Sequence, residues 1–203
     1  MVILGYSGHA FVVIDIFDSC GIVVTGYIDS QKDENPYMLK WLGKEGDLTV
    51  EKLLQSEEYF VSIGDNHIRE RVTEKLLKSN GHNEPSIARH KNSIISKTAE
   101  IKSGTFIGAG VVINSMSRIG KGVILNTGCI VEHENIIGNY SHIAPGAVLA
   151  GNVTVGERSF IGANSVIIQG ITIGDDVIVG AGAVVIRDVP SGSKVVGVPQ
   201  KHI

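Results

Sequence analysis

Residues 119–137 read IGKGVILNTGCIVEHENII, and an aliphatic residue recurs at every sixth position within them. An internal repeat constrains the architecture more strongly than any other sequence feature. A period of six matches neither the 3.6 residues of a helical turn nor a simple array of hairpins, but it fits a coil whose every side is a short strand plus a corner. The register runs without a slip through sixteen positions: Ile95, Ile101, Ile107, Ile113, Ile119, Leu125, Val131, Ile137, Ile143, Leu149, Val155, Ile161, Ile167, Ile173, Val179 and Val185.

The other positions of the hexad support this coil. The residue four after each aliphatic one is mostly small or β-branched, as at Val111 and Ala147, and lies two before the next aliphatic residue, so both side chains are predicted to point inward. Glycine recurs one and three residues after the aliphatic position, where a corner needs positive φ or close backbone approach. Three hexads make a triangular coil of 18 residues, and sixteen make about five coils stacked roughly 4.8 Å apart.

Residues 1–85 follow a different pattern, that of an α/β unit. Val2–Leu4 and residues 22–28 are predicted strands, separated by the turn Gly5-Tyr6-Ser7-Gly8-His9 and a helix over residues 10–19. Strand, glycine turn, helix, strand and a final acid, here Asp29, form half of a Rossmann-like nucleotide-binding fold. Backbone N–H groups at the start of the helix favour a phosphate.

The remainder of this unit is predicted from periodicity. A third strand is expected over residues 59–63 and an amphipathic helix over residues 68–79, with Arg69 on its polar side and Gly81 as its cap. Residues 29–46 are predicted to form a loop, and residues 82–94 a link. The β-helical domain then spans residues 86–203, with coils over 95–189 and a tail over 190–203.

Composition excludes several classes of function. The chain has 203 residues, 5% aromatic residues and a net charge of −3, so no basic field indicates a nucleic-acid or anionic-membrane partner. No apolar run approaches the roughly 18 residues of a membrane span. Cys20 lies in the first unit and Cys129 at an inward coil position, which favours a reduced, cytoplasmic protein.

One corner of the coils carries candidate catalytic residues. His133 is two residues after Val131, so it projects away from the lumen, and Gly151 follows 18 residues later and should stack on it. A base beside an uncovered N–H donor suits acyl transfer, because the imidazole takes a proton from the nucleophile and the amide stabilises the oxyanion. Glu134 is expected to hold the imidazole tautomer. Asn135 either supports this corner or hydrogen-bonds along the lumen with Ser117 or Ser141.

The segments GYSGHA, SIGDNHIRER, VILNTGCIVEHENIIG, SHIAPGAVLAGNVTVG and VVGVPQKHI resemble those of hexapeptide-repeat nucleotide-sugar acetyltransferases of the PglD/NeuD-like type. The resemblance covers nearly the whole chain. It implies a left-handed parallel β-helix, a homotrimer with active sites between neighbouring subunits, and acetyl-CoA as co-substrate in a groove between coils. The expected activity is N-acetylation of a nucleotide-linked amino sugar, most simply a UDP-4-amino-4,6-dideoxy sugar.

The resemblance also assigns residues. His133 matches the general base, Glu134 its partner and Gly151 the backbone donor to the thioester. The residues on the substrate side are Gly5, Ser7, Gly8, His9, Asp29, Asn66, Asn126 and His142. The residues expected near the coenzyme are Ala150, Gly151, Gly170, Val198, Pro199 and Lys201, with Gln200 in place of the usual alanine. No metal is expected, because only His133 and His142 lie within the coils proper.

Two other functions remain open from the sequence. The same chemistry could acetylate a sugar hydroxyl, as in sialic acid O-acetylation. A trimeric scaffold that binds a nucleotide without catalysis is the second alternative, and it predicts no binding of acetyl-CoA.

Overall fold

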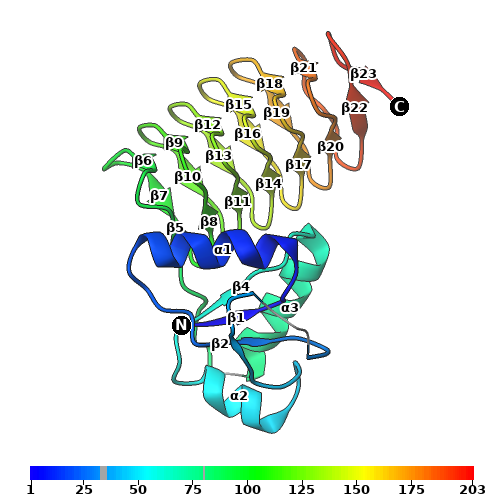
Figure 1. Cartoon of the computed structure of the whole chain (residues 1–203). Helices are drawn as coiled ribbons and strands as arrows, with labels where there is room; N and C mark the ends of the chain where they lie inside the picture. Colours follow the sequence, from blue (N-terminus) through cyan, green and yellow to red (C-terminus); the bar gives the residue numbers. More distant parts are fainter. Residues whose placement is uncertain (33–35, 80) are drawn as a thin grey trace.

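The structure, a computed structural model, describes residues 1–32, 36–79 and 81–203. It consists of a small α/β part followed by a three-sided parallel β-helix, which rises from the α/β part as a stack of coils (Figure 1). The expected fold class is therefore confirmed. The sheet of the α/β part is parallel, with the order β3-β2-β1-β4.

The elements of the α/β part follow one another as strand, helix, strand. Their bounds are β1 (Val2–Leu4), α1 (Gly8–Ser19), β2 (Gly26–Ile28), β3 (Lys40–Trp41), α2 (Leu48–Leu54), β4 (Tyr59–Val61) and α3 (Asn66–Ser79). The chain places β2 and β3 on one side of β1 and β4 on the other, so the strand order reverses between β1 and β4.

Two sequence predictions in this part were wrong in detail, and one element was not predicted. The predicted loop over residues 29–46 contains β3, which pairs with β2, whereas residues 33–35 of that loop lie outside the described residues. The second strand is shorter than predicted, because Ile22 and Val23 lie on the surface rather than in the sheet. Helix α2 was not predicted. Short edge elements depend on tertiary pairing more than on local pattern.

The β-helix has three sheets, here called the first, second and third. The first comprises β5 (Ala88–Arg89), β8 (Phe106–Ile107), β11 (Ile124–Leu125), β14 (His142–Ile143), β17 (Phe160–Ile161), β20 (Ile178–Val179), β22 (Lys194–Val196) and the antiparallel β23 (Lys201–His202). The second comprises β6 (Ile94–Ile95), β9 (Val112–Ile113), β12 (Ile130–Val131), β15 (Val148–Leu149), β18 (Val166–Ile167) and β21 (Val184–Val185). The third comprises β7 (Glu100–Ile101), β10 (Arg118–Ile119), β13 (Ile136–Ile137), β16 (Thr154–Val155) and β19 (Thr172–Ile173).

The predicted register is confirmed. Val131 pairs with Leu149 and Ile137 with Val155, an offset of 18 residues that makes one coil. The aliphatic positions fill a continuous core together with the small inward residues. Cys129 is fully buried there, and burial raises the pKa of its thiol to about 12, so it has no thiolate at neutral pH.

The coils extend beyond the predicted ends. The predicted link over residues 82–94 contains β5 and the first residue of β6, and Ala88 pairs with Phe106 in the regular register. The repeat was missed there because Arg89 takes an aliphatic position at the open end of the prism. Near the other end the offset falls from 18 to 16, as Ile178 pairs with Lys194.

Glycine serves two separate purposes at the corners. The position three after the aliphatic residue has positive φ, both at glycines such as Gly128 (67°) and at other residues such as Met116 (63°) and Glu134 (60°). The position one after it instead needs close backbone approach, because a Cβ at Gly138 would lie 2.6 Å from the backbone nitrogen of Glu157. Both reasons anticipated for corner glycines are thus correct, each at its own position.

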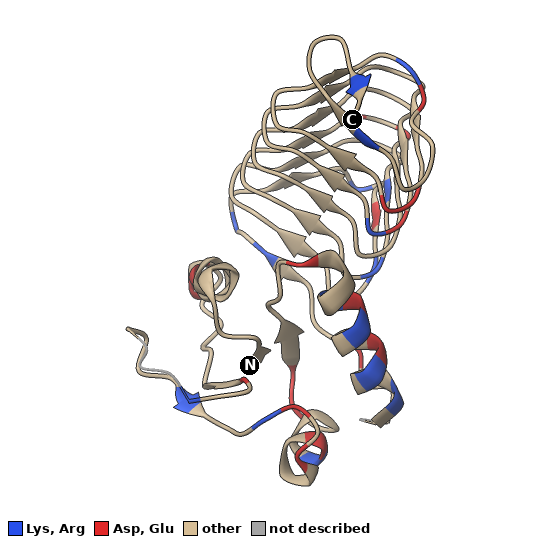
Figure 2. Cartoon of the chain, turned by 90° about the vertical axis from the view of Figure 1, so that its right-hand side faces the viewer, with Lys and Arg blue, Asp and Glu red and all other residues tan. Residues whose placement is uncertain are grey.

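The outer faces of the sheets differ in polarity. The outward residues of the second sheet are all aliphatic: Ile94, Val112, Ile130, Val148, Val166 and Val184. They are partly or fully exposed. Charged residues gather instead on the helices of the α/β part and along one side of the β-helix (Figure 2). The second sheet is therefore a continuous apolar face.

The α/β part packs on the first sheet. Ala88, Phe106 and Ile124 of that sheet belong to one apolar cluster with α1. Arg69 of α3, predicted to lie on the polar side of its helix, is instead 1% exposed. Its guanidinium donates to the carbonyl oxygens of Gly122 (2.7 Å) and Tyr140 (2.7 Å), at the corners of two successive coils.

Candidate active site

His133 lies in the corner between β12 and β13, outside the lumen, and its side chain is 53% exposed. Nδ1 of the ring is 3.0 Å from Oε2 of Glu134. A carboxylate at that distance stabilises the tautomer with hydrogen on Nδ1, which leaves a lone pair on Nε2. The predicted pairing of an imidazole with its acidic neighbour is present.

Gly151 lies one coil above His133, as the spacing predicts. A Cβ at Gly151 would lie 2.6 Å from Nε2 and 2.5 Å from Cε1 of His133, so the imidazole occupies the space that a side chain would need. Among the described residues no acceptor takes the N–H of Gly151, whereas its carbonyl accepts from Gly170. The corner therefore presents a basic nitrogen beside an uncovered amide.

Asn135 fixes the backbone of this corner from inside. It is fully buried, donates from Nδ2 to the carbonyl of Glu132 (2.6 Å) and accepts at Oδ1 from the amide of Val153 (2.8 Å). Ser117 donates to the same carbonyl of Glu132 (2.8 Å). Asn135 and Ser117 thus hold the main chain beside His133, and neither Ser117 nor Ser141 is recorded as a hydrogen-bond partner of Asn135.

A second group of candidate residues lies on the first sheet. Nε2 of His142 is 3.1 Å from Nδ2 of Asn126, and its ring packs edge-on against Phe160 at 5.0 Å. The ring of His9 lies 4.7 Å from that of Phe106 on the same face. Nε2 of His9 is buried and has no hydrogen-bond partner among the described residues. These groups line the junction of the α/β part with the β-helix.

Both histidines are held neutral. Burial, reinforced by the charge of Arg69, lowers the pKa of His9 to about 4. Burial, then Arg69 and His9, lowers the pKa of His142 to about 3. They are therefore uncharged hydrogen-bonding groups at neutral pH, unlike a solvated histidine.

This burial predicts a dependence of stability on pH. Unfolded histidines have a pKa near 6.5, so below about pH 6.5 the unfolded chain binds protons that folded His9 does not bind until about pH 4 and folded His142 does not bind until about pH 3. The free energy of unfolding that depends on these two histidines is thus fully present above pH 6.5 and decreases as the pH falls. We expect the thermal midpoint to drop by several degrees between pH 7 and pH 5. His142→Asn should flatten this slope, whereas His82→Asn, a surface control, should leave it unchanged; equal slopes in all three proteins would contradict the assignment.

The glycine turn after β1 has the expected form. Gly5 has φ of 89°, and a Cβ there would lie 2.8 Å from Cγ1 of Ile63. Ser7 and Gly8 are exposed at the start of α1. The carboxylate of Asp29 accepts from the amide of Tyr6 (2.7 Å) and from the amide of Ser30 (2.6 Å). Asp29 therefore holds the turn as well as bordering the space beside it.

Asn66 joins the two parts of the chain. It is 8% exposed, and Nδ2 donates to the carbonyls of Arg158 (2.9 Å) and Ser159 (3.3 Å) while Oδ1 accepts from Arg69 (2.8 Å). Both polar atoms of the Asn66 side chain are therefore engaged in hydrogen bonds that connect the α/β part with the β-helix. Its expected contact with the nucleotide stays a prediction.

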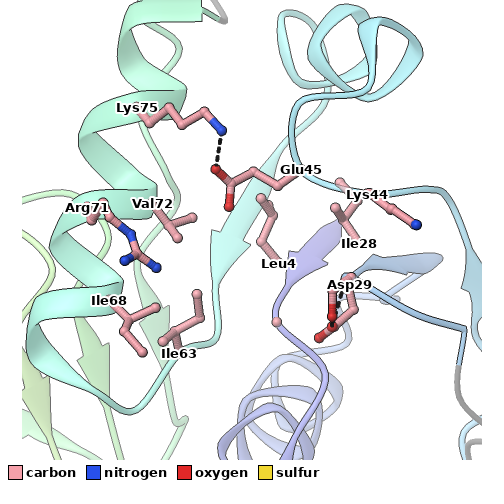
Figure 3. A pocket seen from close by; sticks show the side chains of 12 residues that line it. Leu4, Ile28, Asp29, Lys44, Glu45, Ile63, Ile68, Arg71, Val72 and Lys75 are labelled. Atoms are coloured by element: carbon pink, nitrogen blue, oxygen red, sulfur yellow. Dashed lines mark hydrogen bonds and ion pairs between the residues drawn. The ribbon is translucent and has the colours of Figure 1, made fainter.

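A crevice of about 500 Å³ opens at the carboxyl ends of β1, β2 and β4 (Figure 3). Leu4, Ile28 and Ile63 form its apolar walls. Glu45, from the loop before α2, reaches toward Lys75 of α3 and pairs with it at 2.7 Å. Since the strand order reverses between β1 and β4, the crevice lies where open parallel sheets bind their ligands.

The C-terminal tail lies at the same edge of the prism as His133. Gln200 accepts at Oε1 from the amide of Ile186 (2.8 Å) and donates from Nε2 to the carbonyl of Arg187 (3.0 Å). Arg187 is three coils beyond His133, roughly 14 Å along the edge at about 4.8 Å per strand. Val198, Pro199 and Lys201 flank these two hydrogen bonds, here called the clasp of Gln200. Ala150, Gly151 and Gly170 lie on this edge between His133 and the tail.

Within one chain the candidate residues do not form a single cleft. His133 stands at the corner of the second and third sheets, whereas His142 and Asn126 are on or beside the first sheet, which faces the α/β part. The resemblance implies a cleft between neighbouring subunits, so the expectation that these residues line it stays a prediction. The spacing of six residues assigns each residue to one side of the triangular coil, but it does not say which side faces the α/β part.

The described part of the chain has neither a metal-ligand cluster nor a helix suited to span a membrane. Residues 1–32, 36–79 and 81–203 contain no cluster of three or more His, Cys, Asp or Glu side chains arranged to hold a metal ion. They also contain no helix with the length and apolarity to cross a membrane.

Family models match both parts of the chain. Residues 1–76 match the PglD N-terminal domain, and residues 152–187 match the hexapeptide repeat of succinyl-transferase. A curated relative, an uncharacterised protein of Acanthamoeba polyphaga mimivirus, is 34% identical over 103 residues, which are 50% of this chain and 20% of that protein. The chain thus spans about a fifth of that relative.

Solved structures match the whole chain. GDP-perosamine N-acetyltransferase from Caulobacter crescentus, in a histidine variant bound to CoA and GDP-perosamine, is 38% identical, with a TM-score of 0.92 over 100% of this chain and 95% of that one. The acetyltransferase domain of PglB from Neisseria gonorrhoeae, in complex with acetyl coenzyme A, is 30% identical, with a TM-score of 0.90 over 100% and 98%. WeeI from Acinetobacter baumannii is 26% identical, with a TM-score of 0.82 over 100% and 98%. The chain therefore belongs to the PglD/NeuD-like family of left-handed β-helix sugar acetyltransferases.

Proposed function

We propose that this enzyme transfers the acetyl group of acetyl-CoA to the amine of a nucleotide-linked 4-amino-4,6-dideoxy sugar, with His133 as general base. The observation that carries the proposal is the imidazole stacked on the uncovered amide of Gly151. The relatives' complexes with CoA, acetyl coenzyme A and GDP-perosamine support the reaction class. A uridine nucleotide and a cytoplasmic location stay predictions from the sequence.

The acetyl group passes directly from the thioester to the amine, without an acyl-enzyme intermediate. The neutral amine attacks the thioester carbonyl, so a C–N bond forms and the oxyanion accepts a hydrogen bond from the Gly151 amide. Nε2 of His133 takes the proton of the amine, and Glu134 stabilises the resulting imidazolium. Collapse of the intermediate breaks the C–S bond, and the proton passes to the leaving thiolate. Cys129, buried in the lumen, takes no part as a nucleophile.

The coenzyme is proposed to lie along the edge that carries His133. Gly151 and Gly170, 19 residues apart in successive coils, leave two places on this edge without a side chain, beside the exposed Ile168 and Gln169. The clasp of Gln200 holds the tail at the far end of the same edge. Lys201 is exposed beside it and can meet a phosphate of the coenzyme.

The nucleotide is proposed to occupy the crevice at the ends of β1, β2 and β4. The turn from Gly5 to Gly8 presents backbone amides of the α1 N-terminus to a phosphate. Around the crevice, three cations, Lys44, Arg71 and Lys75, outnumber two acids, Asp29 and Glu45. The excess positive charge favours a diphosphate. His9, Asn126 and His142 then face the sugar as neutral donors and acceptors.

A homotrimer is proposed to complete the site. The apolar face of the second sheet is continuous over six coils, and such a face in a water-exposed protein indicates association. A ring of three copies packed through heterologous contacts can bring the His133 corner of one chain to the nucleotide crevice of the next. This arrangement accounts for the separation of His133 from His142 within one chain.

The function is tested by an acetyl-transfer assay with a panel of acceptors. Purified enzyme and acetyl-CoA are given nucleotide-linked 4-amino sugars, free amino sugars and sialic acid, and products are identified by mass. Acetylation of a nucleotide-linked amine is expected. Transfer to a hydroxyl alone would favour the O-acetyltransferase alternative, and failure to bind CoA in calorimetry would favour a non-catalytic scaffold.

Glu134→Gly separates the catalytic role of this residue from its structural one. Glu134 is in the left-handed region, which is roughly 1–2 kcal/mol less favourable for a non-glycine residue, so glycine should maintain or raise stability. The same change removes the carboxylate 3.0 Å from His133 and is expected to lower kcat about 10- to 100-fold. Thermal unfolding and steady-state kinetics measure the two effects.

Met116→Gly is the matched control. Met116 occupies the same corner position one coil earlier, with φ of 63°, and makes no contact with the imidazole that the structure records. It should raise stability similarly and leave kcat unchanged. An equal loss of kcat in both variants would mean that Glu134 matters only to the backbone.

A further inference from the structure

The end of the nucleotide crevice is closed by a charged pair rather than by apolar side chains. Oε1 of Glu45 is 2.7 Å from Nζ of Lys75, and the two side chains are 34% and 57% exposed. In Figure 3 the pair lies on one side of Leu4, and the turn that leads to α1 lies on the other. A nucleotide whose phosphates meet that turn therefore directs its base toward Glu45 and Lys75.

The loop that carries Glu45 is built to hold it there. Gly43 and Gly46 have φ of 128° and 90°, and the carboxylate of Asp47 accepts from the amide of Lys44 (2.8 Å). These features fold residues 43–47 into a tight turn over the crevice. In the part of the chain that the structure describes, Oε2 of Glu45 accepts no hydrogen bond, whereas both oxygens of Asp29 are occupied. Glu45 is thus the acid of the crevice with acceptor capacity for a ligand.

The bases differ in what they offer to such a pair. Guanine presents two adjacent donors, N1–H and the N2 amino group, next to the acceptor O6. A carboxylate accepts from two parallel donors, and an ammonium group can donate to O6. Uracil presents a single N3–H between two carbonyl oxygens, one of which would face the carboxylate. The exposed ion pair itself contributes little to stability, so a ligand can open it at small cost.

We infer that Glu45 and Lys75 read the base of the sugar nucleotide and select guanine over uracil. The inference rests on the proposed function, because it takes the crevice as the nucleotide site of the acetyltransferase. It differs from the uridine nucleotide that the sequence resemblance suggests. Leu4, Ile63 and Val72 supply apolar walls against which a purine ring can lie.

Calorimetry with GDP, UDP, ADP and CDP tests the inference on the full-length protein. A well-formed bidentate contact discriminates between bases by roughly 10-fold or more, so GDP is expected to bind at least about 10-fold more tightly than UDP. Glu45→Gln should remove most of this preference by weakening GDP and leaving UDP nearly unchanged. Lys75→Met should reduce GDP binding less. Glu57→Gln, on the exposed surface, is the matched control and should retain the preference.

The outcomes separate this inference from the proposed function. Tighter binding of UDP than of GDP, or an equal effect of Glu45→Gln on both, overturns guanine selection. If UDP-linked but not GDP-linked amino sugars are then acetylated, the acetyltransferase proposal stands without it. If no nucleoside diphosphate binds and no nucleotide-linked amine is acetylated, both proposals fail.

Discussion

His133→Ala is expected to lower kcat by about 10²–10⁴, the usual contribution of a positioned general base. The ring is half exposed at a corner and fills no part of the core, so the thermal midpoint should stay within about 2 °C of the wild type. Binding of CoA should also persist, because the amide of Gly151 and the tail remain. Stopped assays at saturating acetyl-CoA and acceptor measure kcat, and calorimetry measures the coenzyme.

Ser115→Ala is the control for this variant. Ser115 lies in the same column of the corner, one coil before His133, and should retain full turnover. If His133→Ala also turned over at the wild-type rate with saturating substrates, the imidazole would not be the base. A large loss of CoA binding instead of kcat would move His133 to a binding role.

Mixing variants tests whether the site spans two chains. His133→Ala and His142→Ala are co-expressed, each inactive or nearly so alone. If His133 of one chain works with His142 of the next, random mixing in a cyclic trimer leaves about a quarter of the sites with both histidines. Activity near that fraction is expected. A mixture no more active than the separate variants would place both histidines in one chain's site, contrary to the proposal.

Arg69→Leu is expected to destabilise the protein by at least about 3–5 kcal/mol, because several buried oxygens each lose a charged donor at a cost of roughly 1–3 kcal/mol. All five N–H groups of Arg69 are used: the carbonyls of Gly122, Tyr140, Ile63 and Gly64 and Oδ1 of Asn66 lie at 2.7–3.0 Å. Leucine would leave these oxygens buried without donors. Chemical denaturation should show the loss, together with an early transition of the α/β part.

Two further variants keep this prediction testable if Arg69→Leu does not fold. Arg69→Lys retains a charge but has three donors in place of five, so an intermediate loss is expected. Arg118→Leu, on the exposed face of the third sheet, should change stability by no more than about 0.5 kcal/mol. In Arg69→Lys the pKa values of His9 and His142 should stay low, since burial is their main cause. A wild-type denaturation curve for Arg69→Leu would show that the bonds are replaced by water.

The β-helix and its corner could be predicted because their determinants repeat along the chain. A period of six specifies which residues point inward, and an offset of 18 specifies which residues stack. The stacking of Gly151 on His133 therefore follows from their spacing of 18 residues. The positive φ at Glu134 also follows from its hexad position. The α/β part has no such repeat. There, β3 and α2 are short and depend on neighbouring strands, and local pattern did not reveal them.

By itself the sequence determined the three-sided coil, its lumen and the edge on which an imidazole meets an uncovered amide, because side-chain alternation and a constant coil length leave no other register. Only the tertiary structure decided where the two parts of the chain meet. It buried Arg69, which its helical pattern assigned to solvent, and it separated His133 from His142 by putting them at opposite sides of the prism. Helix periodicity describes one element alone, whereas the burial of a charge depends on the carbonyl groups that another element brings to it.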